Sequence, residues 1–161
     1  MNFYPWFRPG LLLWWTIAAA HADMVVVVSA KSPVQPMSAE QIAQIFLGKT
    51  NTFPGGMFAM PFDLPDSHPV REQFYLRIAG KTPAQMKGYW SRMIFTGKGQ
   101  PPFEIPGTGD VKKLVAGNPN TIGYVDRAAV DSSLKIVFSD WPGDGRPVVT
   151  NPPCALMYSD R

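Results

Sequence analysis

The chain has 161 residues, of which 45% are hydrophobic and 17% charged, so it carries enough apolar surface for one folded domain. Its 17 prolines, about twice the roughly 5% of average proteins, exclude a long helical bundle and favour short elements joined by ordered turns. The formal net charge is only +3 and the lysines and arginines are scattered, which argues against a nucleic-acid partner.

The first 22 residues are typical of an export signal. Arg8 precedes an apolar run at 11–20, which is too short to cross a membrane. The tripeptide Ala20-His21-Ala22 then has small residues at both outer positions of a signal-peptidase site. We therefore expect cleavage after Ala22, a mature chain that begins at Asp23, and a periplasmic location.

Strands and helices are expected to alternate along the mature chain. A run of β-branched residues at 24–29 predicts a buried strand, and Ser38 with Gln41 predicts the capping box of a helix that ends at Gly48. The remaining patterns predict strands at 57–62, 122–125 and 134–138, and helices from Pro69 to about Gly80, at 82–95, at 110–116 and around 127–130. This order indicates a three-layer α/β unit with a largely parallel sheet over 23–138, followed by a Pro/Gly-rich tail over 139–161.

The loop between the second predicted strand and its helix is the first candidate site. Open α/β sheets bind ligands at such strand ends, and a helix N-terminus there offers free N–H groups to an anion. The two carboxylates of this loop repel an anion unless it brings a proton to donate. The residue types alone favour simple helix capping by Asp66 or Ser67, with Arg71 paired to an acid at the surface. The candidate binding residues are Asp63, Asp66, Ser67, His68 and Arg71.

A second candidate is Gly107-Thr108-Gly109, which opens another predicted helix and whose glycines allow a nest of backbone N–H groups. A flexible turn is the alternative interpretation of this short pattern. An aromatic set at helical spacing suits a sugar or peptide platform, but such spacing favours core packing. Its members are Tyr75, Tyr89, Trp90, Phe95 and Phe103.

Cysteine and histidine usage argues against metal and covalent chemistry. Cys154 is the only cysteine, and after cleavage His68 is the only histidine, so zinc sites built from several such ligands are excluded. No nucleophile motif accompanies His68. We expect no catalytic residue, no metal and no cofactor, and therefore a protein that is not an enzyme.

Two segments carry a family resemblance. Ser38–Lys49 (SAEQIAQIFLGK) resembles the S-x-E-Q-[LI]-x-x-I-F-x-G-K segment of periplasmic solute-binding proteins of the phosphate ABC-transport type, and Asn118–Val125 is similar to their x-P-G-x-I-G-Y-V. The match covers roughly 25–137 and implies the fold of one lobe of a type 2 periplasmic-binding protein. Where that family has an Arg-x-Asp-Gly-Ser-Gly-Thr anion loop, this chain reads Asp63–Pro69, without the arginine and both glycines.

The resemblance implies binding of phosphate or a similar oxyanion at the loop of Asp63 to Arg71, with an ABC-transporter permease or an envelope protein as partner. Arg71 is expected at the rim of the lobe, outside the core. Because a single lobe lacks the second wall of the cleft, we expect either a homodimer that encloses the loop or a monomer with affinity no tighter than about micromolar. The alternative function is an interaction module that has lost anion binding and docks its cleft face on an envelope protein or on itself.

The export signal gives a direct prediction. Mass spectrometry of the protein from an envelope fraction is expected to show Asp23 as the first residue. An intact Met1 terminus in soluble cytoplasmic material would remove both the signal peptide and the periplasmic location.

Overall fold

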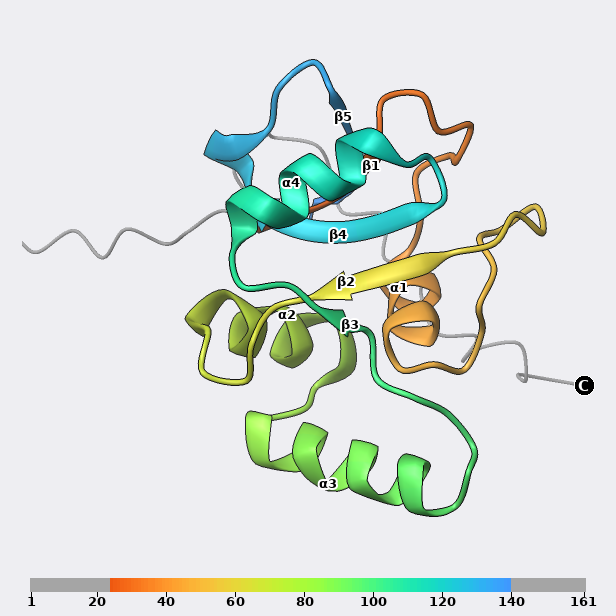
Figure 1. Ribbon diagram of the computed structural model, residues 1–161, viewed down its shortest axis with the longest axis vertical. Helices are drawn as coiled ribbons and strands as arrows, with labels where there is room; N and C mark the ends of the chain where they lie inside the picture. Colours follow the sequence, from red (N-terminus) through yellow and green to blue (C-terminus); the bar gives the residue numbers. More distant parts are fainter. Residues whose placement is uncertain (1–23, 140–161) are drawn as a thin grey trace, which may run out of the picture.

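The described part of the chain, residues 24–139 of a computed structural model, contains one five-stranded sheet with the order β3-β2-β4-β1-β5 (Figure 1). The expected signal peptide, residues 140–161 of the expected tail and Cys154 lie outside the described residues, whereas Ser139, predicted to begin the tail, ends the last strand. The strands are β1 (Met24–Ser29), β2 (Met60–Asp63), β3 (Phe103–Glu104), β4 (Thr121–Asp126) and β5 (Leu134–Ser139). The helices are α1 (Ala39–Phe46), α2 (Pro69–Ala79), α3 (Pro83–Phe95) and α4 (Thr108–Gly117), with a 3₁₀ turn η1 (Arg127–Ala129).

The sheet is mixed in strand direction. Strand β2 pairs in parallel with β3 and with β4, as the predicted order requires, whereas β1 pairs antiparallel with both β4 and β5. The parallel pairs lie on the side of the sheet that carries the first candidate loop, so the carboxyl end of β2 opens onto that loop. The predicted α/β class is confirmed, and its parallel character belongs to this half of the sheet.

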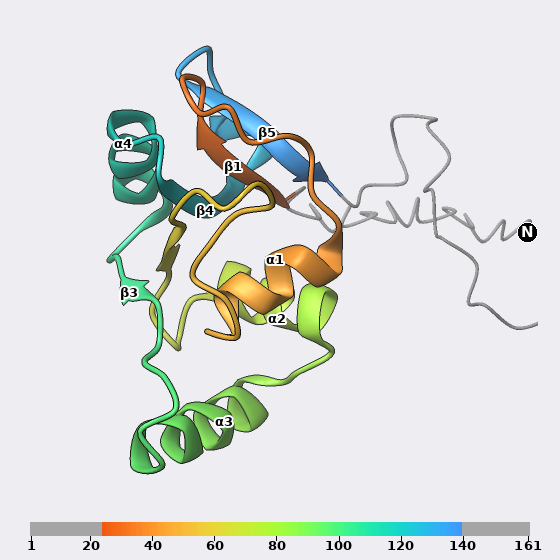
Figure 2. The same ribbon diagram turned by 90° about the vertical axis from the view of Figure 1, so that its right-hand side faces the viewer.

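Helices cover both faces of the sheet, which gives the three predicted layers (Figure 2). Alternation along β4 shows which helices lie where. Tyr124 points to the side of α1 and α2, where it stacks on Phe74 with 4.0 Å between ring centroids, and Phe46 packs edge-on to Phe74 at 4.6 Å. Gly123 points to the opposite face, against Val111 and Val115 of α4. Helix α3 lies beyond α2, farther from the sheet (Figures 1 and 2).

The helix starts follow their local signals. Ser38 and Gln41 form the predicted capping box of α1, and Thr82 with Gln85 forms the same motif at α3. Gly48 then ends the turn after α1 with a φ of 64°, and its α-carbon lies close to the Trp90 ring.

Two strand predictions need correction. Strand β2 begins at Met60 rather than at residue 57, because 57–59 form an antiparallel turn in which the Phe53 N–H bonds the Met57 carbonyl at 2.7 Å and the Ala59 N–H bonds the Asn51 carbonyl at 2.8 Å. The sequence also places a loop where β3 lies. That two-residue strand exists because β2 offers it an open edge.

The expectation that all five aromatic residues belong to the core is wrong for two of them. Tyr75 and Trp90 are buried and Tyr89 is partly buried against the core. Phe95 is 93% exposed and Phe103 is 63% exposed. Phe95 follows Trp90 by five residues, which places it on the opposite side of α3, and Phe103 lies on the edge strand.

A pair of glycine substitutions, one at the contact between β4 and α4 and one away from it, is expected to have opposite effects on stability. In Gly123→Ala the new Cβ would lie 2.6 Å from a methyl group of Val111, whose β-branched side chain in α4 has little freedom to move. We expect a loss of about 1–3 kcal/mol in the free energy of unfolding. Gly88→Ala, in the open middle of α3, is the control and is expected to gain about 0.5–1 kcal/mol. Urea denaturation measures both; equal effects would contradict the packing described.

Candidate functional site

A buried carboxylate, that of Asp63 at the end of β2, is the centre of the candidate loop. Asp63 is only 3% exposed, and each of its two oxygens accepts two hydrogen bonds. The donors are Arg71 Nε at 3.0 Å, the Tyr75 hydroxyl at 2.7 Å, the Leu64 backbone N–H at 2.8 Å and the Tyr124 hydroxyl. Four donors offset the loss of hydration, so this buried charge is satisfied within the protein.

Helix α2 begins with a rigid turn that sets the positions of these groups. The His68 N–H bonds the Pro65 carbonyl at 2.9 Å, and His68 Nδ1 accepts the Val70 N–H at 3.2 Å as the N-cap of the helix. Pro69 at the first helical position has no N–H to satisfy. The helix therefore starts in a fixed orientation, with Arg71 on the side that meets Asp63.

The expectation that Arg71 lies at the rim is wrong. Its side chain is 9% exposed, because it bonds Asp63 through Nε and Asp66 through a terminal nitrogen and lies over the Tyr75 ring at 5.1 Å. Burial alone favours the neutral guanidine, but the charge and hydrogen bond of Asp63 outweigh it and raise the pKa of Arg71. Asp63 and Asp66 thus compensate the arginine before any ligand arrives.

The two tyrosines are held in their neutral form. Burial raises the pKa of both Tyr75 and Tyr124, and the nearby negative charge of Asp63 raises it further. Each hydroxyl donates to the carboxylate, and the Tyr124 oxygen also accepts the Leu64 N–H at 3.2 Å. The network therefore ties β2, α2 and β4 together at the strand end that faces the candidate site.

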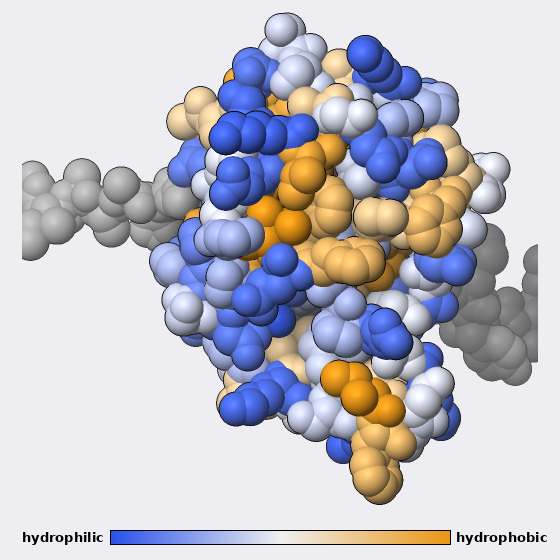
Figure 3. Space-filling view, in the orientation of Figure 1, coloured by the Kyte–Doolittle hydropathy of each residue, from blue (hydrophilic) through white to orange (hydrophobic). Residues whose placement is uncertain are grey.

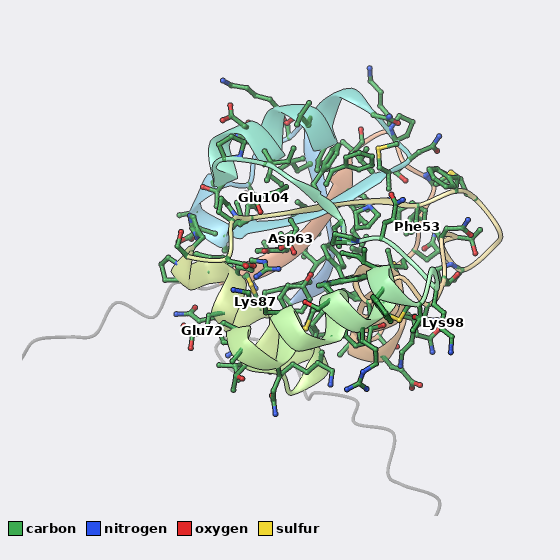
Figure 4. All side chains as sticks on the ribbon, turned by 60° about the horizontal axis from the view of Figure 1, so that its bottom comes forward. Phe53, Asp63, Glu72, Lys87, Lys98 and Glu104 are labelled. Carbon is green, nitrogen blue, oxygen red and sulfur yellow. The ribbon has the colours of Figure 1, made fainter. Side chains whose placement is uncertain are left out.

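A pocket of about 260 Å³ opens beside this network, between the β2–α2 loop, α3 and the chain that leads into β3. Figure 4 shows Asp63 between the labelled Glu104 of β3 and Lys87 of α3. The residues that line it with polar or charged groups are Asp63, Asp66, Arg71, Lys87, Trp90, Ser91 and Glu104. The Trp90 indole N–H is buried there without a hydrogen-bond partner.

Some of the expected binding residues line this pocket and others do not. Asp63, Asp66 and Arg71 do, whereas Ser67 and His68 are in the turn outside its lining, with His68 Nδ1 committed to capping. The second candidate, Gly107-Thr108-Gly109, forms the start of α4 and lies outside the pocket. Gly107 has an extended φ of −159°, and no residue of this triplet has a positive φ, so the triplet does not form the left-handed turn of an N–H nest.

Sequence reasoning missed the contribution of α3. Lys87 and Ser91 are four residues apart, so they share one side of the helix. That spacing is a weak signal, because nothing local shows that α3 folds back to face the β2–α2 loop. Only the tertiary structure brings these two side chains opposite Arg71.

A second, larger groove of about 540 Å³ runs along the other side of Pro101 and Pro102, lined by the exposed rings of Phe58 and Phe103. Lys49 is its one charged lining residue. The smaller pocket therefore has more charged lining residues than this groove.

Within residues 24–139, no cluster of three or more His, Cys, Asp or Glu side chains is arranged to hold a metal ion. None of the helices described for these residues is long and apolar enough to cross a membrane.

Comparison with solved structures identifies the fold as that of phosphate ABC-transporter substrate-binding proteins. A protein from Clostridium perfringens described as such and solved with bound phosphate matches with a TM-score of 0.55 and 23% identity, over 71% of this chain and 44% of its own. An ABC-type phosphate transport receptor from Vibrio cholerae gives 0.52 and 17%, over 71% and 45%. PstS from Borrelia burgdorferi gives 0.51 and 15%, over 71% and 46%.

The chain thus spans less than half the length of these proteins, and the fold expected from the resemblance is confirmed. No family model and no curated protein sequence matches the chain.

The tyrosine–carboxylate network predicts a specific loss of stability in alkali. The folded state keeps the protons of Tyr75 and Tyr124 above a pH of about 10, where tyrosines of the unfolded chain lose theirs. The unfolded state then binds fewer protons, so the free energy of unfolding falls as pH rises, by about 1.4 kcal/mol per pH unit for each tyrosine. Denaturation of the wild type and Tyr124→Phe between about pH 8 and 11 tests this.

The variant is expected to lose about 1.5–3 kcal/mol at neutral pH, because a hydrogen bond to a charged group is removed. It is also expected to show a shallower decline above about pH 10. Parallel curves for the two proteins would contradict the proton-holding role of the network.

Proposed function

We propose that this chain is an exported solute-binding protein whose described lobe binds a small oxyanion of the phosphate type without chemical conversion. The observation that carries this proposal is the 260 Å³ pocket, in which Lys87 and Ser91 of α3 face Arg71 of α2 at the carboxyl end of β2. The fold shared with phosphate-binding transport proteins supports the same ligand class. An ABC-transporter permease or another envelope protein is the proposed partner.

The donors open to the ligand are set by the pairing of Arg71. Its Nε and one terminal nitrogen already bond Asp63 and Asp66, which leaves the Lys87 ammonium and the Ser91 hydroxyl as the main new contacts. Asp63, with four donors on two oxygens, acts by positioning Arg71. In this proposal the ligand is bound chiefly by α3.

The carboxylates restrict which oxyanions fit. Asp66 and Glu104 line the pocket and repel a fully ionised anion. An oxyanion that carries a proton donates it to one of these carboxylates, which converts repulsion into a hydrogen bond. Hydrogen phosphate meets this condition at neutral pH, whereas sulfate does not.

The affinity is expected to be low for a single chain. One wall leaves much of the ligand hydrated, whereas good small-molecule sites bury 70% or more of the ligand surface. We propose either a dissociation constant no tighter than about micromolar or a homodimer whose second copy covers the pocket.

Calorimetric titration of the mature protein with phosphate, arsenate and sulfate tests the proposal, with light scattering to follow oligomeric state. Lys87→Gln is expected to weaken phosphate binding roughly ten- to hundred-fold, because it removes a charge-assisted hydrogen bond at an exposed position. Lys31→Gln, an exposed lysine at the far end of β1, is the control and should leave binding unchanged.

Arg71→Ala is a poor probe of binding alone. Loss of the Arg71 side chain leaves the buried Asp63 carboxylate without its cation, so the free energy of unfolding is also expected to fall. If Lys87→Gln leaves phosphate binding intact, the ligand binds elsewhere. A strict monomer with nanomolar affinity for phosphate would contradict the proposed site with a single wall.

A further inference from the structure

The C-terminal end of α3 presents an apolar tip to solvent. Phe95 is 93% exposed and its neighbour Ile94 is 57% exposed, which makes Phe95 the most exposed large hydrophobic residue of the described chain. Figure 3 shows an isolated hydrophobic patch over α3 with hydrophilic residues around it. Transfer of an exposed phenyl ring out of water lowers the free energy. This tip is therefore a surface that favours contact with an apolar phase.

The tip is an ordered part of the helix. The Thr96 hydroxyl donates to the Arg92 carbonyl at 2.8 Å, and the Gly97 and Lys98 N–H groups bond the Ile94 and Met93 carbonyls, each at 3.0 Å. On the opposite side of α3, Met86 and Trp90 are buried in the core. These contacts fix the helix, so Phe95 is held outward.

The segment of the chain that carries the tip is rich in positive charge. Between Glu72 and Glu104 the chain has five basic residues and no acidic residue, although its formal net charge is only +3. The rest of the chain therefore carries a formal net charge of −2. The five residues are Arg77, Lys81, Lys87, Arg92 and Lys98. The excess of positive charge thus lies on α3 and the segments that flank it, because these residues have no acidic neighbours in the sequence.

We propose that the end of α3 docks on the surface of an anionic phospholipid bilayer. Ile94 and Phe95 enter the interface between headgroups and acyl chains, while Arg92 and Lys98, which flank them in sequence, contact the lipid phosphates. The tip borders the proposed oxyanion pocket through Ile94, which lines it, whereas Phe95, Arg92 and Lys98 do not line it and can be changed without altering the pocket.

A bilayer fits this surface better than the two other occupants. A second copy of the chain would bring two basic faces together, which charge repulsion opposes. A protein partner would need to enclose a protruding ring in a pocket of its own. A fluid anionic interface accepts a protruding apolar tip with a basic border directly, without a matching shape.

Co-sedimentation of the full mature chain with vesicles tests this proposal. One set contains phosphatidylcholine alone, and the other contains phosphatidylglycerol and phosphatidylcholine at about 3:7. Weak binding to the anionic set only, lost at high salt, is expected. Phe95→Ser should lower the partition coefficient about tenfold, and Arg92→Gln with Lys98→Gln about twenty-fold or more.

Two of the matched control residues, Lys113 and Leu114, lie on α4, at the opposite end of the molecule (Figure 1), and the third, Lys31, follows β1. Leu114→Ser removes a comparably exposed apolar side chain, and Lys31→Gln with Lys113→Gln removes the same charge from two exposed lysines away from α3. All four variants are expected to keep phosphate binding, which separates failure of this proposal from failure of the pocket.

Absence of vesicle binding, or equal binding to neutral vesicles, would overturn the proposal. A Phe95→Ser variant that binds like the wild type, while the Arg92→Gln, Lys98→Gln variant does not, would also overturn it. That result would mean that α3 attracts acidic surfaces in general, including acidic proteins.

Discussion

The candidate site depends on one buried charge, the carboxylate of Asp63. Its hydrogen bonds join the end of β2 to α2 through Arg71 and Tyr75 and to β4 through Tyr124. Removing one of the four donors leaves the buried carboxylate with fewer hydrogen bonds, which is costly in a low-dielectric interior. The loop between β2 and α2 is therefore held rigidly by electrostatic interactions. This loop forms one side of the small pocket, and α3 forms another side.

The end of β2 differs in charge from the anion loop of the family that the sequence resembles. There the motif begins with an arginine, whereas here the segment begins with Asp63, and the arginine that compensates it comes from the first turn of α2. In the proposed site, the positive charge that faces the ligand is that of Lys87 on α3. The same fold thus supports a site whose cations come from helices rather than from the loop.

Local signals were sufficient for most of the fold. The valine run predicts β1, and the capping boxes at Ser38 and Thr82 predict the starts of α1 and α3, because each motif stabilises its element with neighbouring residues. Strand β3 was missed because two residues become a strand only beside β2. Arg71 was expected in water because its partner Asp63 and the buried ring of Tyr75 are visible only once the helix has packed. Lys87 and Ser91 were missed for the same reason: the path of α3 back across the loop is a tertiary property.

The brevity of β3 has a consequence for how this chain behaves at high concentration. An open sheet edge is a template on which a second molecule can add a strand, and proteins suppress this with short edges and prolines. Here the edge beside β2 ends in two paired residues, with Pro101 and Pro102 before them and Pro106 shortly after. Three of the flanking positions lack the N–H that a growing ladder would need. The lobe described here is in this way protected against edge-to-edge aggregation on that side.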